Sequence, residues 1–286
     1  MTTVVLSSKI YDADQLAYVE GYLKTLFKGL MVKIENIEIT VDGRIQVVFH
    51  GEDGKVALNY LEKEVGLSPI RLEALKKFST VKGYITKLGV DEISVDIGVI
   101  FPKTLDASVP LQRLQAQLAD GRKIAMQRMA ELYGLTENMP LTVKITSLCE
   151  DHVEADLAET QLATYKRWVK TLFDRLMVLG ASQSETWKAI KNARCQSDII
   201  TIEPLGLFEH AIVCKLGTDA VGLIPKIGKH LPNTKLEVFK PKMILEFFGA
   251  TSLTQCGWWA GPDLNRRPSA RQADVLTELD YRPSLE

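Results

Sequence analysis

The sequence of 286 residues predicts an α+β fold built from successive units along the chain. Strand and helix patterns alternate within the first 76 residues, whereas further along they fall into separate segments. The composition, 46% hydrophobic and 25% charged, is that of an ordinary globular protein. We therefore expect an α+β unit, a strand-rich unit, a helical connector, a β-rich unit and a tail, over residues 1–76, 77–157, 158–196, 197–254 and 255–286.

The first unit has a β-α-β-β-α pattern. Asp12 and Gln15 have the spacing of a capping box at the start of a helix that Gly29 ends. Asp42-Gly43 is a two-residue hairpin signal between two β-rich runs. We expect a small domain with helices on one face of a sheet. Its elements are strands over 4–10, 32–41 and 44–50, a helix from 12 and a helix over 53–65.

The second unit has strand patterns over 81–85, 93–99, 141–145 and 153–157, and helical patterns over 110–118 and 122–133. With Gly83 in its first strand, Val95-Asp96-Ile97-Gly98-Val99 as its second and Val109-Pro110-Leu111 leading into a helix, it resembles the S1-type oligonucleotide-binding (OB) barrel. The resemblance covers about 80 residues. It implies a closed barrel with an oligonucleotide-binding face, where Tyr84 and Phe101 are the available aromatic side chains.

The connector is predicted to be helical because apolar residues recur at helical spacing over 159–178. Gly180 ends this helix, and Ser182 and Glu185 form a capping-box pattern at the start of a second one. The last unit is expected to contain strands over 199–202, 210–215 and 220–224, separated by Pro and Gly turns.

Basic side chains gather in the second half of the chain. Residues 1–159 carry five more acidic than basic side chains, and residues 160–254 carry five more basic than acidic ones. Such a split is typical of a polyanion-binding half, although it equally fits a solvated helix face. Trp168 and Trp187 could stack on bases, but their helical positions favour the core. The candidate nucleic-acid-binding residues are Lys166, Arg167, Lys170, Arg175, Lys188, Lys191, Arg194, Lys226 and Lys229.

Metal binding and catalysis have less support. Cys195, His210 and Cys214 could come together as a partial set of metal ligands, but zinc sites use four ligands with compact paired spacing. His210 and Cys214 would share one face if they lie on a strand. Buried cysteines and a hydrogen-bonded histidine are the commoner arrangement. The sequence therefore predicts no metal, no cofactor and no catalytic residue.

The last unit contains four distinctive segments, which are Ser197-Asp198-Ile199-Ile200, Leu205-Gly206-Leu207-Phe208-Glu209-His210, the run from Cys214 to Ala220, and Gly222-Leu223-Ile224-Pro225. On these segments, residues 1–254 as a whole are similar to the archaeal DUF2110 family. It implies an archaeal cytoplasmic protein and brings no known activity. No apolar run approaches the length of about 20 residues that a membrane span requires. We accordingly expect a cytoplasmic protein without a membrane partner.

Residues 258–283 resemble the translation of a transfer-RNA gene from its opposite strand. The codons of Trp258 and Trp259 read as CCA on the other strand, and Asp263-Leu264-Asn265 can encode the complement of the T loop. The remaining codons allow all four stems to pair. We expect residues 255–286 to be a non-native tail, disordered or forming a short helix, and we exclude its arginines from every functional argument.

The function that these observations favour is RNA binding by a non-enzymatic module associated with translation or RNA metabolism. It rests on the barrel-like middle and the basic connector. The alternative is a protein-interaction or assembly factor whose charge split matches a partner protein. A third possibility is a small-molecule enzyme that uses the His210 region.

Overall fold

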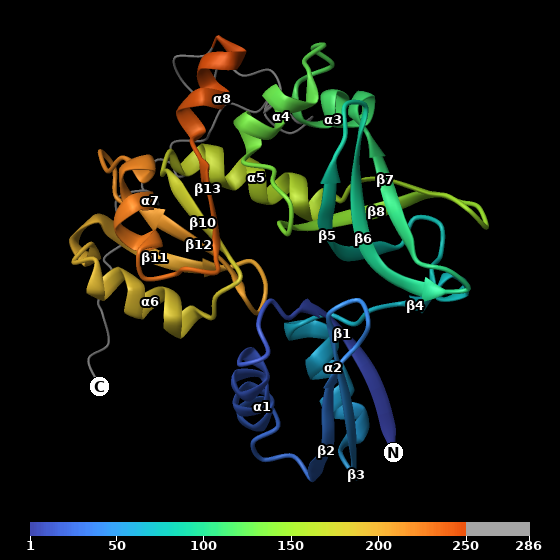
Figure 1. The fold of residues 1–286 in the computed structure, drawn as a ribbon. Helices are drawn as coiled ribbons and strands as arrows, with labels where there is room; N and C mark the ends of the chain where they lie inside the picture. The colour runs from blue at the N-terminus through green and yellow to red at the C-terminus, as the bar shows by residue number, and fades with distance from the viewer. Residues whose placement is uncertain (250–286) are drawn as a thin grey trace, which may run out of the picture. The chain divides into compact units, whose positions relative to one another are not determined.

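A computed structural model describes residues 1–249, and the structural statements below concern these residues. Within residues 1–249 there are three sheets, of three, six and four strands, accompanied by helices (Figure 1). The fold is therefore α+β, as predicted. No helix in the described part of the chain is long and apolar enough to cross a membrane. The predicted non-native tail over 255–286 lies outside the described residues.

The N-terminal sheet has the strand order β1-β3-β2, and all pairs are antiparallel. Both of its helices pack on one face of the sheet, because their buried side chains join those of β3 in one apolar cluster. Gly43 has a φ of 80°, which the tight turn between β2 and β3 requires. The β-α-β-β-α prediction is confirmed. The elements are β1 (Thr2–Lys9), α1 (Gln15–Leu26), β2 (Val32–Ile39), β3 (Arg44–Gly51) and α2 (Gly54–Glu64).

The first helix begins later than the capping-box pattern predicts. The side-chain Oε1 of Gln15 accepts hydrogen bonds from the backbone N–H of Tyr11 at 2.9 Å and of Asp12 at 3.4 Å. Its Nε2 donates to the carbonyl of Gly180 at 2.8 Å. Gln15 therefore closes a turn before α1 and also ties that turn to a distant segment. The capping-box pattern predicts the first of these two roles of Gln15 but not the second.

The six-stranded sheet closes into a barrel because β6 pairs with both β5 and β7. Around the barrel the strands run β6-β5-β8-β9-β7, and β4 (Ile70–Arg71) extends β6 on one side. Alternate side chains fill the interior, among them Val95, Val109 and Val143, which are fully buried. A closed barrel agrees with the resemblance to the OB fold. Its strands are β5 (Thr80–Leu88), β6 (Glu92–Phe101), β7 (Leu105–Pro110), β8 (Pro140–Leu148) and β9 (Val153–Leu157).

The strand β7 was not predicted from the sequence. Its residues, Leu-Asp-Ala-Ser-Val-Pro, include three types that are depleted in strands, and β7 becomes a strand because it pairs with β6 and β9. The two helices expected after this segment are present, as α3 (Leu111–Leu118) and α4 (Met126–Tyr133).

The C-terminal sheet has the order β11-β12-β10-β13. The Ser182 capping box is present, with the side chain of Ser182 accepting from the N–H of Glu185 and that of Glu185 accepting from the N–H of Ser182. The elements in this part are α5 (Glu159–Thr171), β10 (Arg175–Leu179), α6 (Gln183–Asn192), β11 (Ile199–Pro204), β12 (Glu209–Cys214), α7 (Ala220–Gly228), β13 (Lys235–Phe239) and α8 (Pro241–Phe248).

Two sequence predictions in this region were wrong. The helix expected over 159–178 ends at Thr171, Leu172 takes a left-handed conformation, and β10 follows as an inner strand between β12 and β13. The strand expected over 220–224 is the start of α7, where the side chain of Asp219 accepts hydrogen bonds from the N–H groups of Val221 and Gly222. In both places the apolar run is short enough to fit either a helix or a strand, and periodicity cannot distinguish the two.

Helices cover both faces of the C-terminal sheet. Leu176 and Val178 of β10 pack into an apolar cluster with residues of α6 and α7. Arg175, the residue before Leu176, faces the other way and lies over the ring of Trp168 on α5, at 5.0 Å from its centroid. Trp168 also packs edge-on against Phe239 of β13. The sheet therefore separates α5 from α6 and α7.

We expect the substitution Asp219→Ala to lower the free energy of unfolding by about 1 kcal/mol, because it removes the hydrogen bonds that cap α7. Urea denaturation measures this change. Asp14→Ala is the matched control, since Asp14 occupies the same position before α1 without a side-chain capping bond. Equal losses in the two variants would contradict the capping role.

Candidate nucleic-acid interface

The structure divides the predicted basic residues between two faces. Lys166, Arg167 and Lys170 lie on α5, whereas Lys188 and Lys191 lie on α6 and Arg194 follows that helix. Lys226 and Lys229 lie in and just after α7. Because α5 and the α6–α7 pair cover opposite faces of the C-terminal sheet, these residues do not share one basic face.

Arg175 does not reach the surface. Its side chain is 1% exposed, and it donates hydrogen bonds to the backbone carbonyls of Phe173 and Trp168. It also forms an ion pair with Glu203 at 3.6 Å. Burial lowers the pKa of its guanidinium, and the neighbouring Glu203 opposes this shift. Arg175 therefore links β10 to Trp168 of α5 and to Glu203 of β11. Its guanidinium is buried, so a phosphate cannot approach it directly.

The two tryptophans named as possible stacking residues differ in exposure. Trp168 is buried and donates from Nε1 to the carboxylate of Glu203 at 2.9 Å. Trp187 on α6 is 43% exposed, so the expectation that it belongs to the core was wrong.

The face of OB barrels that ordinarily binds oligonucleotides, formed by the second and third strands, corresponds here to β6 and β7. Since Ile93, Val95 and Ala107 point into the barrel, the alternate side chains point outward. These outward side chains include three carboxylates, Glu92, Asp96 and Asp106. Glu92 and Asp106, which have no ion pair among the described residues, disfavour phosphates on this face, whereas the charge of Asp96 is compensated by cations.

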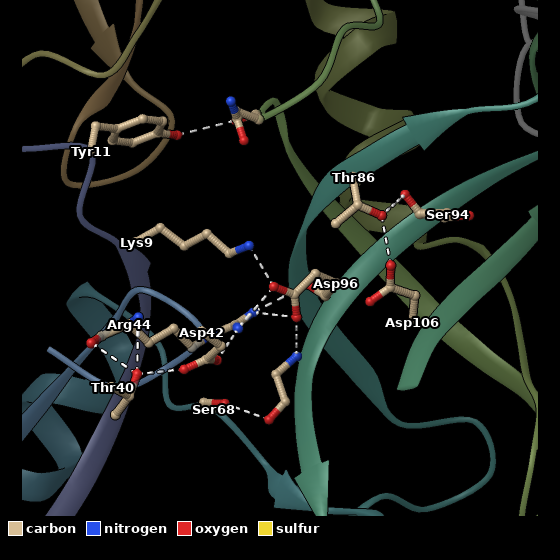
Figure 2. A network of polar contacts seen from close by, with 12 residues as sticks. Lys9, Tyr11, Thr40, Asp42, Arg44, Ser68, Thr86, Ser94, Asp96 and Asp106 are labelled. Atoms are coloured by element: carbon tan, nitrogen blue, oxygen red, sulfur yellow. Dashed lines mark hydrogen bonds and ion pairs between the residues drawn. The ribbon is translucent and has the colours of Figure 1, made fainter. Parts of the chain in front are cut away.

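Part of the same face is occupied by the N-terminal sheet (Figure 2). Both carboxylate oxygens of Asp96 accept from the guanidinium of Arg44, each at 2.9 Å, and Oδ2 also lies 2.5 Å from Nζ of Lys9. Asp42 holds the same guanidinium from the other side at 2.5 Å. Burial would raise the pKa of Asp96, but Arg44 and Lys9 outweigh it and lower that pKa. This charge cluster joins the two sheets and shields the β6–β7 face.

Tyr84, one of the two expected aromatic binding residues, is fully buried. Its hydroxyl donates to Oε2 of Glu209 at 3.4 Å, and the hydroxyl of Tyr11 donates to Oε1 at 2.8 Å. Burial raises the pKa of Glu209 to about 7, against the opposing effect of these hydroxyls and of Lys82. The prediction that Tyr84 is available to stack on a base was wrong, because it belongs to a buried polar cluster. The other expected aromatic, Phe101, is 55% exposed.

An exposed aromatic residue beneath two lysines lies beside the first barrel strand, and the sequence analysis missed it. Phe78 is 62% exposed, and the Nζ atoms of Lys77 and Lys144 lie 5.2 and 5.8 Å from the centroid of its ring. Lys144 on β8 pairs with Thr80 on β5, and Lys82 lies two residues further along the same outer face. The signal in the sequence was the run Lys76-Lys77-Phe78 immediately before a strand pattern.

A hollow of about 410 Å³ lies between this barrel face and α5. Arg167 lines it and forms an ion pair with Glu203 at 3.2 Å. Gln161 of α5 accepts from the backbone N–H of Thr142 on β8 at 3.1 Å, which fixes the helix against the barrel. The polar and aromatic lining consists of Lys82, Thr142, Gln161, Thr164, Arg167, Trp168 and Glu203.

The partial metal-ligand set does not assemble. His210 and Cys214 lie on one face of β12, as expected of a strand, and Cys214 packs in the apolar cluster that also contains Cys195. Burial lowers the pKa of His210 to about 4 and raises that of Cys214 to about 11, so both are neutral near pH 7. Among residues 1–249, no group of three or more His, Cys, Asp or Glu side chains is placed to hold a metal ion.

Two models of one protein family match this chain. The model of the DUF2110 central domain matches residues 75–169, and that of the DUF2110 C-terminal domain matches residues 173–239. Together they cover more than half of the chain. No curated protein has a matching sequence.

Solved structures with nucleic-acid-related descriptions show low similarity. A chain of the a/eIF2alpha–aDim2p–rRNA complex from Pyrococcus horikoshii is 11% identical, with a TM-score of 0.24, over 42% of this chain and 60% of that chain. A multidomain protein with nucleic acid binding domains from Streptococcus pneumoniae is 7% identical, with a TM-score of 0.19, over 78% of this chain and 54% of its own. At these TM-scores the likenesses support no argument about function.

We expect Arg44→Met to lower the free energy of unfolding by about 3–5 kcal/mol, because it leaves the buried Asp96 and the half-buried Asp42 without their shared partner. Chemical denaturation measures the loss. Lys24→Met is the control, since it removes the exposed ion pair with Glu20 and should change stability by less than about 1 kcal/mol. A loss below 1 kcal/mol for Arg44→Met would contradict the structural role of the cluster.

The neighbouring residues Glu209 and His210 should make stability depend on pH in opposite directions. The pKa of Glu209 rises from 4.5 to about 7 on folding, so its contribution is present below pH 4.5 and is lost as pH rises towards 7. The pKa of His210 falls from 6.5 to about 4, so its contribution is present above pH 6.5 and is lost as pH falls towards 4. Each of the two contributions to the free energy of unfolding amounts to about 3 kcal/mol, since each pKa moves by about 2.5.

Thermal unfolding between pH 4 and 8 can separate the two groups. Glu209→Gln should leave a stability that rises with pH between about 4 and 6.5, and His210→Phe one that falls with pH between about 4.5 and 7. Identical pH profiles for both variants and the unsubstituted protein would contradict these buried titrations.

Proposed function

The chain belongs to the DUF2110 family, and on that premise we propose that it is an RNA-binding module of the archaeal cytoplasm that acts in translation or RNA metabolism. The observation that carries the proposal is the exposed ring of Phe78 beneath Lys77 and Lys144. This arrangement lies on the outer face of β5 and β8, on the opposite side of β5 from the acidic β6–β7 face.

Phe78 suits a single-stranded ligand. A base that is not paired in a duplex can stack on an exposed ring, and such stacking contributes about 1–3 kcal/mol per base with little sequence preference. The two lysines beside the ring can neutralise the phosphates that flank the stacked base.

Cations continue from this ring towards α5. Lys82 follows Lys144 along the outer face of β5 and β8, and Arg167 lies across the hollow from it. Lys166 and Lys170 lie on the same helix as Arg167. A strand bound to this face, defined by Phe78, Lys77, Lys144, Lys82 and the α5 cations, would meet a few positive charges. This number fits moderate affinity in a chain whose net charge is −1.

We expect Phe78→Ala to weaken the binding of a labelled single-stranded RNA by about 5- to 150-fold, which corresponds to the loss of one stacked base. Lys144→Gln should weaken binding and reduce the slope of log K against log salt by about 0.7. Fluorescence anisotropy at several salt concentrations measures both effects.

The matched controls lie on the other face of the C-terminal sheet. Trp187→Ala removes an exposed aromatic from α6, and Lys188→Gln removes an exposed lysine from the same helix. We expect both to bind RNA as the unsubstituted chain does. If RNA does not bind at low salt, or if the α6 variants lose binding while the barrel variants retain it, the proposal fails.

A protein-interaction factor remains the second candidate because of the surface beside α6. Trp187 and Ile200 are both exposed and line a hollow of about 440 Å³. Ile200 belongs to β11, which is an edge strand of its sheet. An extended segment of a partner protein could pair with this edge and insert an apolar side chain beside Trp187. Absence of RNA binding by the folded chain would favour this candidate.

A further inference from the structure

We infer that the hollow lined by Lys82 and Arg167 binds a phosphate monoester attached to a nucleoside-sized body. This inference rests on the proposed function, which it deepens by assigning a site to one nucleotide unit. Two ligands carry such a phosphate monoester on a nucleoside. One is a free mononucleotide, and the other is the 5′-phosphorylated end of an RNA strand.

Lys82 is a cation in the barrel wall of the hollow. Its side chain is half-buried in the wall of the hollow, and among residues 1–249 it makes no hydrogen bond or ion pair. A partly desolvated ammonium group is costly unless an anion accompanies it. Burial accordingly lowers the pKa of Lys82, and the nearby Glu209 opposes this shift only in part. An anionic ligand in the hollow would supply the missing partner.

The hollow is lined by more positive than negative side chains. Glu203 lies between two guanidinium groups, at 3.2 Å from Arg167 and 3.6 Å from Arg175, and it also accepts from Nε1 of Trp168 at 2.9 Å. Arg175 and Trp168 compensate Glu203 from the buried side, which leaves Lys82 and Arg167 as the two cations that line the hollow. Two positive charges match a phosphate monoester, which carries about two negative charges near neutral pH.

The rest of the lining of the hollow combines uncharged polar and apolar side chains. Thr142, Gln161 and Thr164 place hydroxyl and amide groups in the hollow, which can bind the hydroxyls of a sugar or the edge of a base. Met139 and Leu205 add apolar surface. At about 410 Å³ the hollow has the size of small-molecule sites, which range over about 300–1,000 Å³. A single nucleotide can contact these polar and apolar groups, whereas a phosphate ion alone is too small to reach them.

Isothermal titration of the full chain with adenosine 5′-monophosphate tests the site. We expect binding, with adenosine and inorganic phosphate each at least about tenfold weaker, since each lacks one half of the contacts. Lys82→Met should weaken binding of the monophosphate by about tenfold or more, because it removes a charge-assisted contact. Arg167→Gln, a change on an exposed part of α5, should weaken it as well.

The matched control is Lys87→Met, which removes an exposed lysine of the same strand β5 outside the hollow. We expect it to bind the monophosphate as the unsubstituted chain does. Thermal unfolding shows whether each variant is folded. If Lys82→Met does not fold, Arg167→Gln decides. Failure of adenosine monophosphate to bind, or binding that neither substitution weakens, overturns the inference.

RNA oligonucleotides with and without a 5′-phosphate distinguish the two sources. A 5′-phosphate that strengthens RNA binding through Lys82 assigns the hollow to an RNA end, whereas binding of the monophosphate with no such preference assigns it to a free nucleotide. RNA with a 5′-hydroxyl that binds in a Phe78-dependent manner, while the monophosphate does not bind, would overturn this inference and leave the proposed function standing. The reverse result would overturn the proposed function alone.

Discussion

The guanidinium of Arg44 is almost completely buried between the carboxylates of Asp96 and Asp42. A buried charge of this kind is stable only with its partners in place, so it fixes how the N-terminal sheet meets the barrel strand β6. Lys9 from β1 approaches the same carboxylate. The placement of the N-terminal sheet against the barrel therefore depends on one cluster of four charged side chains.

That cluster also determines which surface of the barrel is open to a ligand. The β6–β7 face, which binds oligonucleotides in other OB barrels, is acidic here and is partly taken by Arg44 and Lys9. Lysines and an exposed phenylalanine lie instead along β5 and β8, next to the hollow against α5. The same charge cluster that joins the sheets thus leaves the β5–β8 face, rather than the β6–β7 face, as the proposed site for a polyanion.

Many elements could be predicted because their signals are local. Asp42-Gly43 specified a hairpin, and Ser182 with Glu185 specified a helix start, through bonds between residues close in the chain. Predictions failed where partners far along the chain decide the outcome. The apolar run of β10 follows a helix without a clear change of period and becomes a strand because β12 and β13 pair with it. Its position between them moved Arg175 from an expected binding face into the interior.

The sequence by itself determined the α+β class, the β-α-β-β-α start, the resemblance to an OB barrel and the family, because these depend on periodicity, turn residues and short motifs. Only the tertiary structure decided which charges remain accessible. The buried positions of Tyr84 and Glu209, the division of the basic residues by the C-terminal sheet, and the unpaired Lys82 in its hollow all arise from contacts between distant segments. Periodicity shows which side of an element is apolar, whereas pairing and packing decide what lies against its other side.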